Sequence, residues 1–131
     1  MLTQVKEIAT GQNFSQYLGF ELVSAETDHA VLKLSYGEHL GIERVNGGAI
    51  SSLVDTAATC AFWSHDDVGE SSRGATVGFS INYLRLVVAS DLWANATVRR
   101  RGGSICVGDV SVTNAAQQEV AIANVTYKLN P

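Results

Sequence analysis

Residues 45–63, VNGGAISSLVDTAATCAFW, decide the fold of this chain. Apolar residues recur in this stretch at steps of three and four, which places them on one face of an α-helix. They are Ile50, Leu53, Val54, Ala57, Ala58 and Ala61. The stretch contains no proline, and its glycines lie only at the start. It therefore predicts one long helix that is apolar enough to be buried by the rest of the chain.

The start of this helix combines a capping residue with two glycines. The side-chain oxygen of Asn46 can accept a hydrogen bond from a free backbone N–H of the first turn. Gly47 and Gly48 follow, although glycine inside a helix costs about 0.5–1 kcal/mol relative to alanine. Bare backbone N–H groups near the positive end of the helix dipole are open to a ligand. Two turns later Asp55 interrupts the apolar surface, so we expect it at the edge of a buried site.

Length and charge narrow the classes of function. A chain of 131 residues forms one domain, residues 1–131, with enough residues to bury a core. A formal net charge of −4 argues against a nucleic-acid partner. No apolar run approaches the roughly 18 residues that a membrane span needs, and the first residues, MLTQVKEIATGQ, do not form a signal-peptide pattern. We therefore expect a cytoplasmic protein without a membrane partner.

Cysteine and histidine spacing gives no sign of a metal site. Cys60 and Cys106 lie in apolar patterns without metal-ligand spacing, which indicates buried thiols in a reducing compartment. His29, His39 and His65 fall in predicted loops, and none has a partner at ligand spacing. No metal ion is expected.

Strand patterns surround the central helix. Alternation of apolar and polar residues, or apolar runs bounded by turn residues, predicts strands. They cover residues 20–25, 30–36, 76–83, 92–101, 105–113 and 119–129. Gly102-Gly103 is a hairpin signal. A short helix over residues 2–10 and an apolar turn with Phe14, Tyr17 and Leu18 should pack on the body. The pattern predicts an α+β fold in which an antiparallel sheet curls round the helix.

Three parts of the sequence resemble a known family. They are Asn-Gly-Gly at the helix start with an Asp nine residues after the Asn, GATVGFSINYLR at residues 74–85, and VRRRGGSICVGDVSVTN at residues 98–114. Together they resemble the hotdog-fold acyl-CoA thioesterases, and within them the phenylacetate-degradation (PaaI-type) branch. The resemblance implies hydrolysis of aliphatic or aryl acyl-CoA to free acid and coenzyme A without a cofactor. It also implies a homodimer, with homotetramers common in the family.

The resemblance further implies the site residues. The family's HGG motif falls on residues 46–48, where Gly47 supplies the backbone N–H that polarises the thioester carbonyl. The catalytic carboxylate falls on Asp55, and the hydroxyl that assists the water falls on Thr76. Asn46 stands where many relatives have His; its amide can donate a hydrogen bond but cannot shuttle a proton. Whether Asp55 is the general base or the nucleophile stays open.

Coenzyme A also carries phosphates, which need cationic partners. The residues expected to bind substrate and coenzyme A are Gly48, Arg85, Arg99, Arg100, Arg101, Gly103 and Ser104. Arginine suits this role because its guanidinium pairs with phosphate in a fork geometry. The alternative is that these arginines are solvated at a strand end, where ion pairs contribute little.

Spacing along the helix points to a dimer. Asp55 lies eight residues after Gly47, which is about 12 Å along a helix. Reacting groups must approach to about 3 Å, so one copy of the chain cannot place both residues on one carbonyl carbon. Two helices packed antiparallel about a two-fold axis would bring Gly47 of one copy near Asp55 of the other, twice. The expected minimum unit is a homodimer with two composite sites.

Two other functions stay open. The first is a non-catalytic acyl-CoA binding module, in which Asn46 marks the loss of catalysis. The second is a hotdog dehydratase or hydratase. That chemistry needs a His paired with a carboxylate, and no His lies on the helix or at its start. The sequence does not identify the acyl group.

Overall fold

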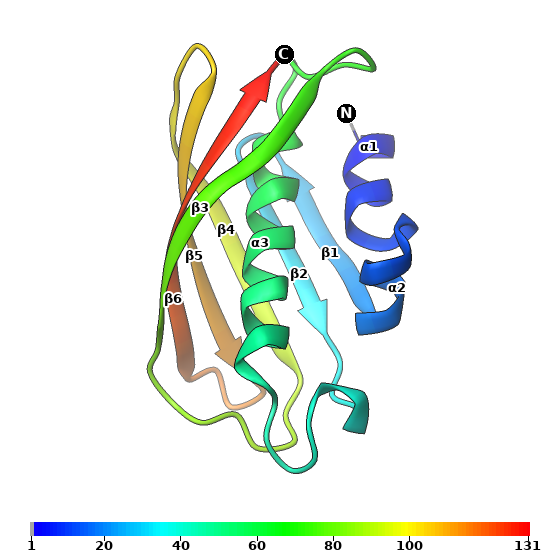
Figure 1. Cartoon of the computed structure of the whole chain (residues 1–131), viewed down its shortest axis with the longest axis vertical. Coiled ribbons are helices and arrows are strands. Elements are labelled where there is room, and N and C mark those ends of the chain that lie inside the picture. The colour runs from blue at the N-terminus through cyan, green and yellow to red at the C-terminus, as the bar shows by residue number, and fades with distance from the viewer. Residues whose placement is uncertain (1) are drawn as a thin grey trace.

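Six antiparallel strands curve around one long helix in the computed structural model, which describes residues 2–131 (Figure 1). The helix is α3, Gly47–Trp63. The strands are β1 Phe20–Glu26, β2 His29–Leu34, β3 Arg73–Tyr83, β4 Leu92–Arg101, β5 Ile105–Asn114 and β6 Glu119–Asn130. Their order in the sheet is β1-β2-β4-β5-β6-β3. The predicted sheet around a central helix is confirmed. None of the helices among the described residues is long and apolar enough to cross a membrane.

Helix α3 begins where the capping pattern predicts. Asn46 has an extended backbone, with φ −61° and ψ 137°, and its side chain accepts from the Gly48 N–H. Just before it, the Val45 N–H donates to the Val87 carbonyl at 2.9 Å. Val45 and Asn46 therefore lead into the helix rather than forming its first turn, and the remainder of the predicted helix is confirmed.

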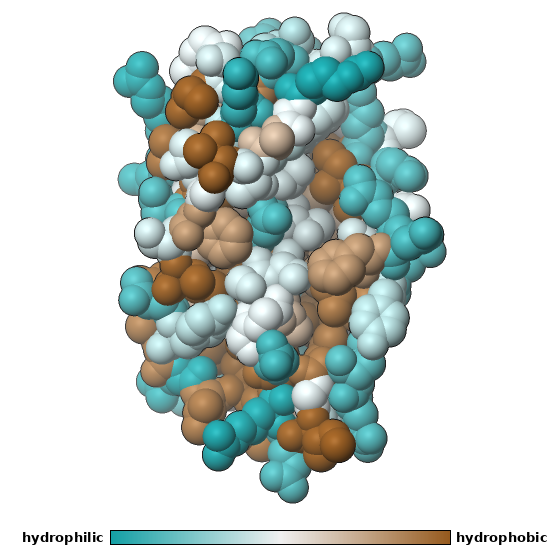
Figure 2. Space-filling view, in the orientation of Figure 1, coloured by the Kyte–Doolittle hydropathy of each residue, from teal (hydrophilic) through white to brown (hydrophobic). Residues whose placement is uncertain are grey.

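One face of α3 is only partly covered. Leu53, Val54 and Ala57 are fully buried against the sheet. Polar residues at helical spacing form a separate stripe that is only half-buried: Ser51, Ser52, Asp55, Thr56 and Thr59. Figure 2 shows this stripe as a pale band over α3, between β3 and the N-terminal helices. The expectation that the helix is buried by the rest of the chain holds only in part for this face, because β3 and the N-terminal segment cover it incompletely.

The edge strand β3 also differs from its sequence pattern. It pairs with β6 alone at the end of the sheet. Only Thr76 and Ile81 are half-buried, while Val77 and Phe79 remain 63% and 37% exposed. The alternation at residues 76–83 therefore builds a strand without a buried face. An exposed edge strand offers unpaired N–H and C=O groups for pairing with another chain.

The N-terminal segment packs beside α3 on the open side of the sheet (Figure 1). It consists of α1, Leu2–Lys6, a π-helical turn, Glu7–Gly11, and α2, Asn13–Leu18. The predicted helix at residues 2–10 is confirmed, and Leu18 is buried as expected. Phe14 and Tyr17 are 61% and 65% exposed. The expectation that they pack on the body is wrong, because Ser15 and Leu18 occupy the buried side of α2.

Candidate active site

Asp55 and Thr76 meet between the central helix and the edge strand. The Thr76 hydroxyl donates to Asp55 Oδ1 at 2.6 Å. Both residues are half-buried, so the carboxylate is reachable while one of its oxygens is held in place. The structure thus brings together two residues that the sequence could place in one site only through the family resemblance.

At the helix start, one backbone donor is used and one is free. The Gly48 N–H donates to Asn46 Oδ1 at 2.7 Å, which makes Asn46 the N-cap. The Gly47 N–H has no acceptor among residues 2–131. Asn46 uses only its side-chain oxygen in the cap, so its amide N–H₂ also stays available to a ligand. The first turn therefore offers the Gly47 N–H, rather than the Gly48 N–H, to a carbonyl oxygen.

Tyr83 fixes this turn from the end of β3. Its hydroxyl donates to the Gly47 carbonyl oxygen at 2.8 Å. A Cβ on Gly47 would lie 3.3 Å from Tyr83 Cζ, so glycine allows the ring to sit close against the helix. Tyr83 is not among the predicted site residues, and its place in the INYLR segment is the only sequence signal for a role there.

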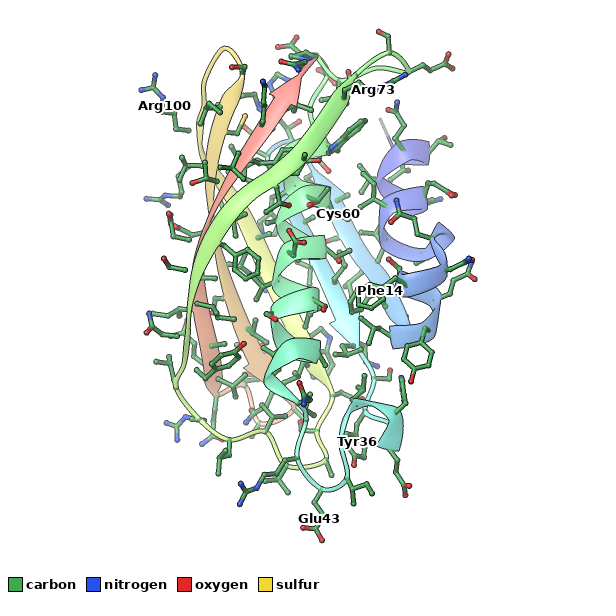
Figure 3. The ribbon with its side chains drawn as sticks, in the orientation of Figure 1. Phe14, Tyr36, Glu43, Cys60, Arg73 and Arg100 are labelled. Atoms are coloured by element: carbon green, nitrogen blue, oxygen red, sulfur yellow. The ribbon has the colours of Figure 1, made fainter. Side chains whose placement is uncertain are left out.

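A cavity of about 330 Å³ opens beside Asp55, between α3, β3 and the N-terminal segment. Its lining residues are Ile8, Gln12, Phe14, Ser15, Ser52, Asp55, Thr56, Thr59, Trp63, Gly74 and Tyr127. Figure 3 shows Phe14 between α2 and α3 on the N-terminal side of this region. The cavity therefore has aromatic and polar walls and reaches the carboxylate directly.

Tyr127 forms the deep wall of this cavity. The Trp63 Nε1–H donates to the Tyr127 hydroxyl oxygen at 2.8 Å, and the Tyr127 ring stacks on Phe62 with a centroid distance of 5.0 Å. Burial raises the pKa of Tyr127 above its ordinary value of 10.0. Neither Tyr127 nor Trp63 is among the predicted site residues.

The predicted coenzyme A arginines do not converge on Asp55. Arg101 Nη2 pairs with Asp28 Oδ1 at 2.8 Å, and its side chain is only 17% exposed. Arg99 pairs with Asp109, while Arg100 extends away from the body at the β4 end (Figure 3). Arg101 would have to give up its ion pair with Asp28 in order to bind a phosphate.

Apart from Gly48, which lies in the first turn of α3, the other predicted binding residues lie in two loops. Gly102 and Gly103 form the expected hairpin, closed by the bond from the Gly102 N–H to the Ile105 carbonyl at 3.0 Å. Ser104 is half-buried in that hairpin, and its carbonyl accepts from the Leu129 N–H. Arg85 is exposed in the loop after β3.

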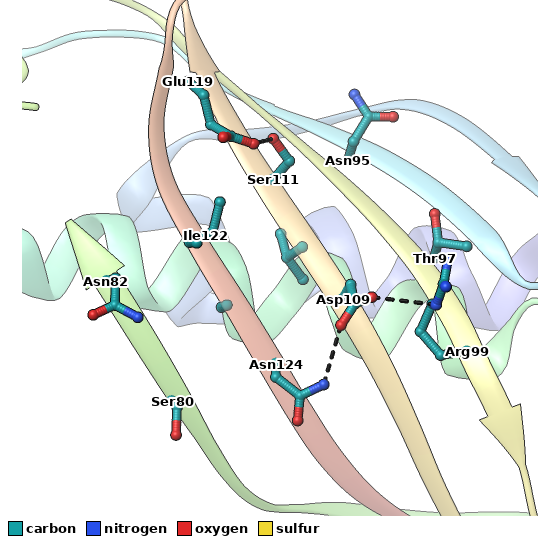
Figure 4. Close-up of a pocket in the computed structure, with 12 residues that line it drawn as sticks. Ser80, Asn82, Asn95, Thr97, Arg99, Asp109, Ser111, Glu119, Ile122 and Asn124 are labelled. Atoms are coloured by element: carbon teal, nitrogen blue, oxygen red, sulfur yellow. Dashed lines mark hydrogen bonds and ion pairs between the residues drawn. The ribbon is translucent and has the colours of Figure 1, made fainter. Parts of the chain in front are cut away.

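A second cavity, of about 530 Å³, lies on the face of the sheet away from α3. Figure 4 looks onto it with the helices behind the strands, and shows Asp109 bonded to both Arg99 and Asn124. It contains none of the four predicted catalytic residues, Asn46, Gly47, Asp55 and Thr76. It is therefore not where the expected reaction would take place.

The cysteines are free and buried, as expected. Burial raises the pKa of Cys60 from 9.0 to about 12, so its thiol is protonated at neutral pH and is a poor nucleophile or metal ligand. Residues 2–131 contain no group of three or more His, Cys, Asp or Glu side chains that could hold a metal ion.

Comparison with known proteins agrees with this arrangement. The chain is 29% identical over 124 residues to the Halobacterium salinarum protein "Putative esterase VNG_1336C", covering 86% of this chain and 82% of that one. It superposes on the Escherichia coli PaaI protein of the phenylacetic acid degradation operon with a TM-score of 0.85, at 23% identity and 97% and 91% coverage. The smu.793 protein of Streptococcus mutans, solved bound to acetyl CoA, gives 27% identity, a TM-score of 0.75, and 86% and 89% coverage.

A family model covers the site itself. The model of the thioesterase superfamily matches residues 43–121, which include Asn46, Gly47, Asp55 and Thr76. The sheet wrapped round α3 is the hotdog arrangement of the solved neighbours. The chain belongs to the thioesterase superfamily.

Proposed function

We propose that this chain is an acyl-CoA thioesterase of the PaaI type that works as a homodimer. The observation that carries the proposal is the hydrogen bond from Thr76 to Asp55 beside an open cavity. Membership of the thioesterase superfamily supports hydrolysis of a thioester. The complex of the Streptococcus mutans relative with acetyl CoA supports coenzyme A as the carrier of the acyl group.

The proposed reaction divides the work between the helix start and the carboxylate. The Gly47 N–H donates to the thioester carbonyl oxygen as negative charge develops there. Loss of one such donor typically lowers the rate by about 10²–10³. Asp55 either removes a proton from the attacking water or attacks the carbonyl carbon itself. The thiolate of coenzyme A is a good leaving group, so the absence of a His at position 46 is tolerated.

Thr76 has a second part beside the role toward water that the family resemblance implies. Its hydroxyl proton is committed to Asp55 Oδ1, so Thr76 also orients the carboxylate. Asp55 Oδ2 is then directed at the reacting water or carbonyl. The lone pairs of the Thr76 hydroxyl can still accept from that water.

Two features of one copy of the chain support the dimer. The Gly47 N–H and Asp55 are separated by about two turns of α3, roughly 12 Å, so each needs a partner from another copy. The polar face of α3 is only half-buried, and the edge strand β3 is largely exposed. Two copies joined along these surfaces would cover both and create the two composite sites.

Release of free thiol from a panel of short aliphatic to aryl acyl-CoAs tests the function. Wild type should hydrolyse at least one member of the panel, and Asp55→Asn should lower kcat by about a hundredfold or more, as for loss of a general base. Asp66→Asn, which changes an exposed carboxylate in the loop after α3, is the matched control and should match wild type. Tight binding of acyl-CoAs without turnover by wild type would instead identify a binding module.

A further inference from the structure

The cavity beside Asp55 contains a buried hydroxyl whose proton is unused. Tyr127 is 3% exposed, yet it lines the cavity. Its oxygen accepts the Trp63 Nε1–H, and a phenol that accepts still has its own proton to donate. No acceptor for that proton lies among residues 2–131. A buried donor without an acceptor is unfavourable, so this position is suited to an acceptor that arrives with a ligand.

The phenol is held firmly in this position. Besides the Trp63 bond, its ring stacks on Phe62 with an interplanar angle of 18°. On the other side, a Cβ on Gly74 would lie 2.6 Å from Tyr127 Cε1. The edge strand therefore needs glycine at residue 74 to make room for the ring. Three separate elements, α3, β3 and β6, thus fix one hydroxyl, which is typical of a preorganised ligand contact.

Three of the four neighbouring side-chain hydroxyls are already occupied, and the fourth, on Thr56, is only half-buried. Ser15 donates to the Ile8 carbonyl, Ser52 to the Gly48 carbonyl and Thr59 to the Asp55 carbonyl. The Tyr127 hydroxyl is therefore a buried donor in the cavity wall, and no described residue accepts its hydrogen bond. Burial, and secondarily the charge of Asp55, raise the pKa of Tyr127, so the phenol stays protonated and can act as a donor at neutral pH.

The hydroxyl also has a useful place relative to Asp55. The hydroxyl lies against Gly74, where a Cβ would be 2.7 Å from it. Gly74 is two residues before Thr76, the partner of Asp55, which is about 7 Å along a strand. Asp55 and Tyr127 line one cavity. An acyl group whose carbonyl sits at Asp55 would run along α3 toward Tyr127. Its far end, rather than its carbonyl, would meet the phenol.

We propose that Tyr127 is a specificity-determining residue that donates a hydrogen bond to an oxygen on the far end of the acyl group. The preferred substrates are then acyl-CoAs that carry a keto, hydroxyl or ether oxygen several bonds from the thioester, and plain hydrocarbon acyl groups are disfavoured. The inference rests on the proposed function, because it takes the cavity beside Asp55 as the acyl site. A site with a polar group that hydrogen-bonds the substrate binds an analogue without that group less well, because the polar group of the site is then left unpaired.

Binding of non-hydrolysable ligands tests this without relying on turnover. The probes are two thioether analogues of acyl-CoA, matched in shape: the 4-acetylphenyl compound with a C=O and the 4-isopropenylphenyl compound with C=CH₂ in its place. Isothermal titration calorimetry should show about tenfold tighter binding of the keto compound by wild type, the value of one hydrogen bond to a neutral donor. Tyr127→Phe should abolish this preference. Equal affinities in wild type, or an unchanged preference in Tyr127→Phe, would overturn the proposal.

Two further variants separate recognition from folding. Tyr127→Phe leaves the Trp63 Nε1–H without its acceptor, which can destabilise the wall. The double variant Trp63→Phe/Tyr127→Phe removes both partners and should also show no preference. Trp63→Phe alone keeps the phenol and should retain the preference. If Trp63→Phe loses the preference while Tyr127→Phe keeps it, the indole and not the phenol recognises the oxygen, and the proposal fails.

The same probes distinguish this inference from the proposed function. Hydrolysis of both parent thioesters, with no difference in affinity between the two thioethers, would leave the thioesterase in place and remove the role of Tyr127. A clear preference for the keto thioether, with no hydrolysis of any acyl-CoA, would support the role of Tyr127 and overturn the thioesterase.

Discussion

The Thr76 hydroxyl donates to Asp55 Oδ1 at 2.6 Å, which joins an edge strand to the central helix across 21 residues of sequence. The contact lies between half-buried residues beside a cavity. A carboxylate held by one oxygen presents the other in a fixed direction, and preorganisation of this kind is what catalysis requires.

Replacing Thr76 should separate orientation of Asp55 from its chemistry. Thr76→Val keeps the shape but removes the hydroxyl, and should lower kcat by about tenfold to a hundredfold, less than loss of Asp55 itself. Thr76→Ser keeps the donor and should retain most of the activity. Thiol-release assays at saturating acyl-CoA measure this. A Val variant as active as wild type would mean that the contact is only structural.

Tyr83 should act as a positioning residue for the Gly47 N–H. Tyr83→Phe removes the hydrogen bond to the Gly47 carbonyl, which is worth about 0.5–1.5 kcal/mol. We therefore expect kcat to fall about threefold to tenfold with KM little changed, because the turn loosens but the acyl cavity is intact. Tyr17→Phe, which removes an exposed hydroxyl on α2, is the control. A change in KM alone would point to substrate binding instead.

Asn46 combines two roles that substitutions can separate. Asn46→Ala removes the cap on the Gly48 N–H and should lower the free energy of unfolding by about 1 kcal/mol. Asn46→Asp keeps an accepting oxygen but removes the amide N–H₂, so it should retain stability while losing activity. Urea unfolding and thiol release, measured on both variants, test this. Full activity of the Asp variant would show that the amide donates nothing to the substrate.

Burial of Cys60 should make stability depend on alkaline pH. The pKa of its thiol rises from 9.0 to about 12 in the folded protein, so above pH 9 the unfolded chain loses this proton first. The contribution of Cys60 to the free energy of unfolding is therefore complete below pH 9 and is lost as the pH rises toward 12. A pKa shift of about three units corresponds to about 4 kcal/mol at most. The free energy of unfolding should fall less steeply between pH 8 and pH 11 in Cys60→Ala than in wild type. Equal pH dependence of the free energy of unfolding in the two proteins would contradict a raised pKa of Cys60.

Local patterns predict much of this fold and little of the cavity. The spacing of Ile50, Leu53 and Val54 predicts α3, and Gly102-Gly103 predicts its hairpin, because both signals are local. Exposure of Phe14 depends on which side of α2 meets the body, which a six-residue helix does not encode. Residues such as Trp63 and Tyr127 lie 64 positions apart and meet only through the order of the strands.

The same limit applies to the candidate site. The family resemblance places Asp55 and Thr76 in one site, and the structure brings them into contact. The arginines at residues 99–101 were grouped because they are adjacent in sequence. Residues two apart share a face of a regular strand, but the pairing of β4 with β5 shifts register between Val98 and Arg100. Arg99 and Arg101 pair with different carboxylates, Asp109 and Asp28. Adjacency therefore predicted a cluster that this irregularity in the strand separates.

We predict that Gly47 of one copy and Asp55 of another share each site, and two variants allow a test. Gly47→Pro deletes the N–H, and proline is tolerated at the first position of a helix. The extended backbone of Asn46, with φ −61° and ψ 137°, suits a residue that precedes proline. Gly47→Ala, which keeps the N–H but crowds Tyr83 in the same way, is the matched control.

The most direct measurement is recovery of activity when Asp55→Ala and Gly47→Pro are unfolded together and refolded as a mixture. Each variant alone should be inactive. Random pairing makes half of the dimers mixed, and each mixed dimer contains one intact site, so we expect about a quarter of the wild-type activity. A mixture that stays as inactive as its two components would contradict the composite site.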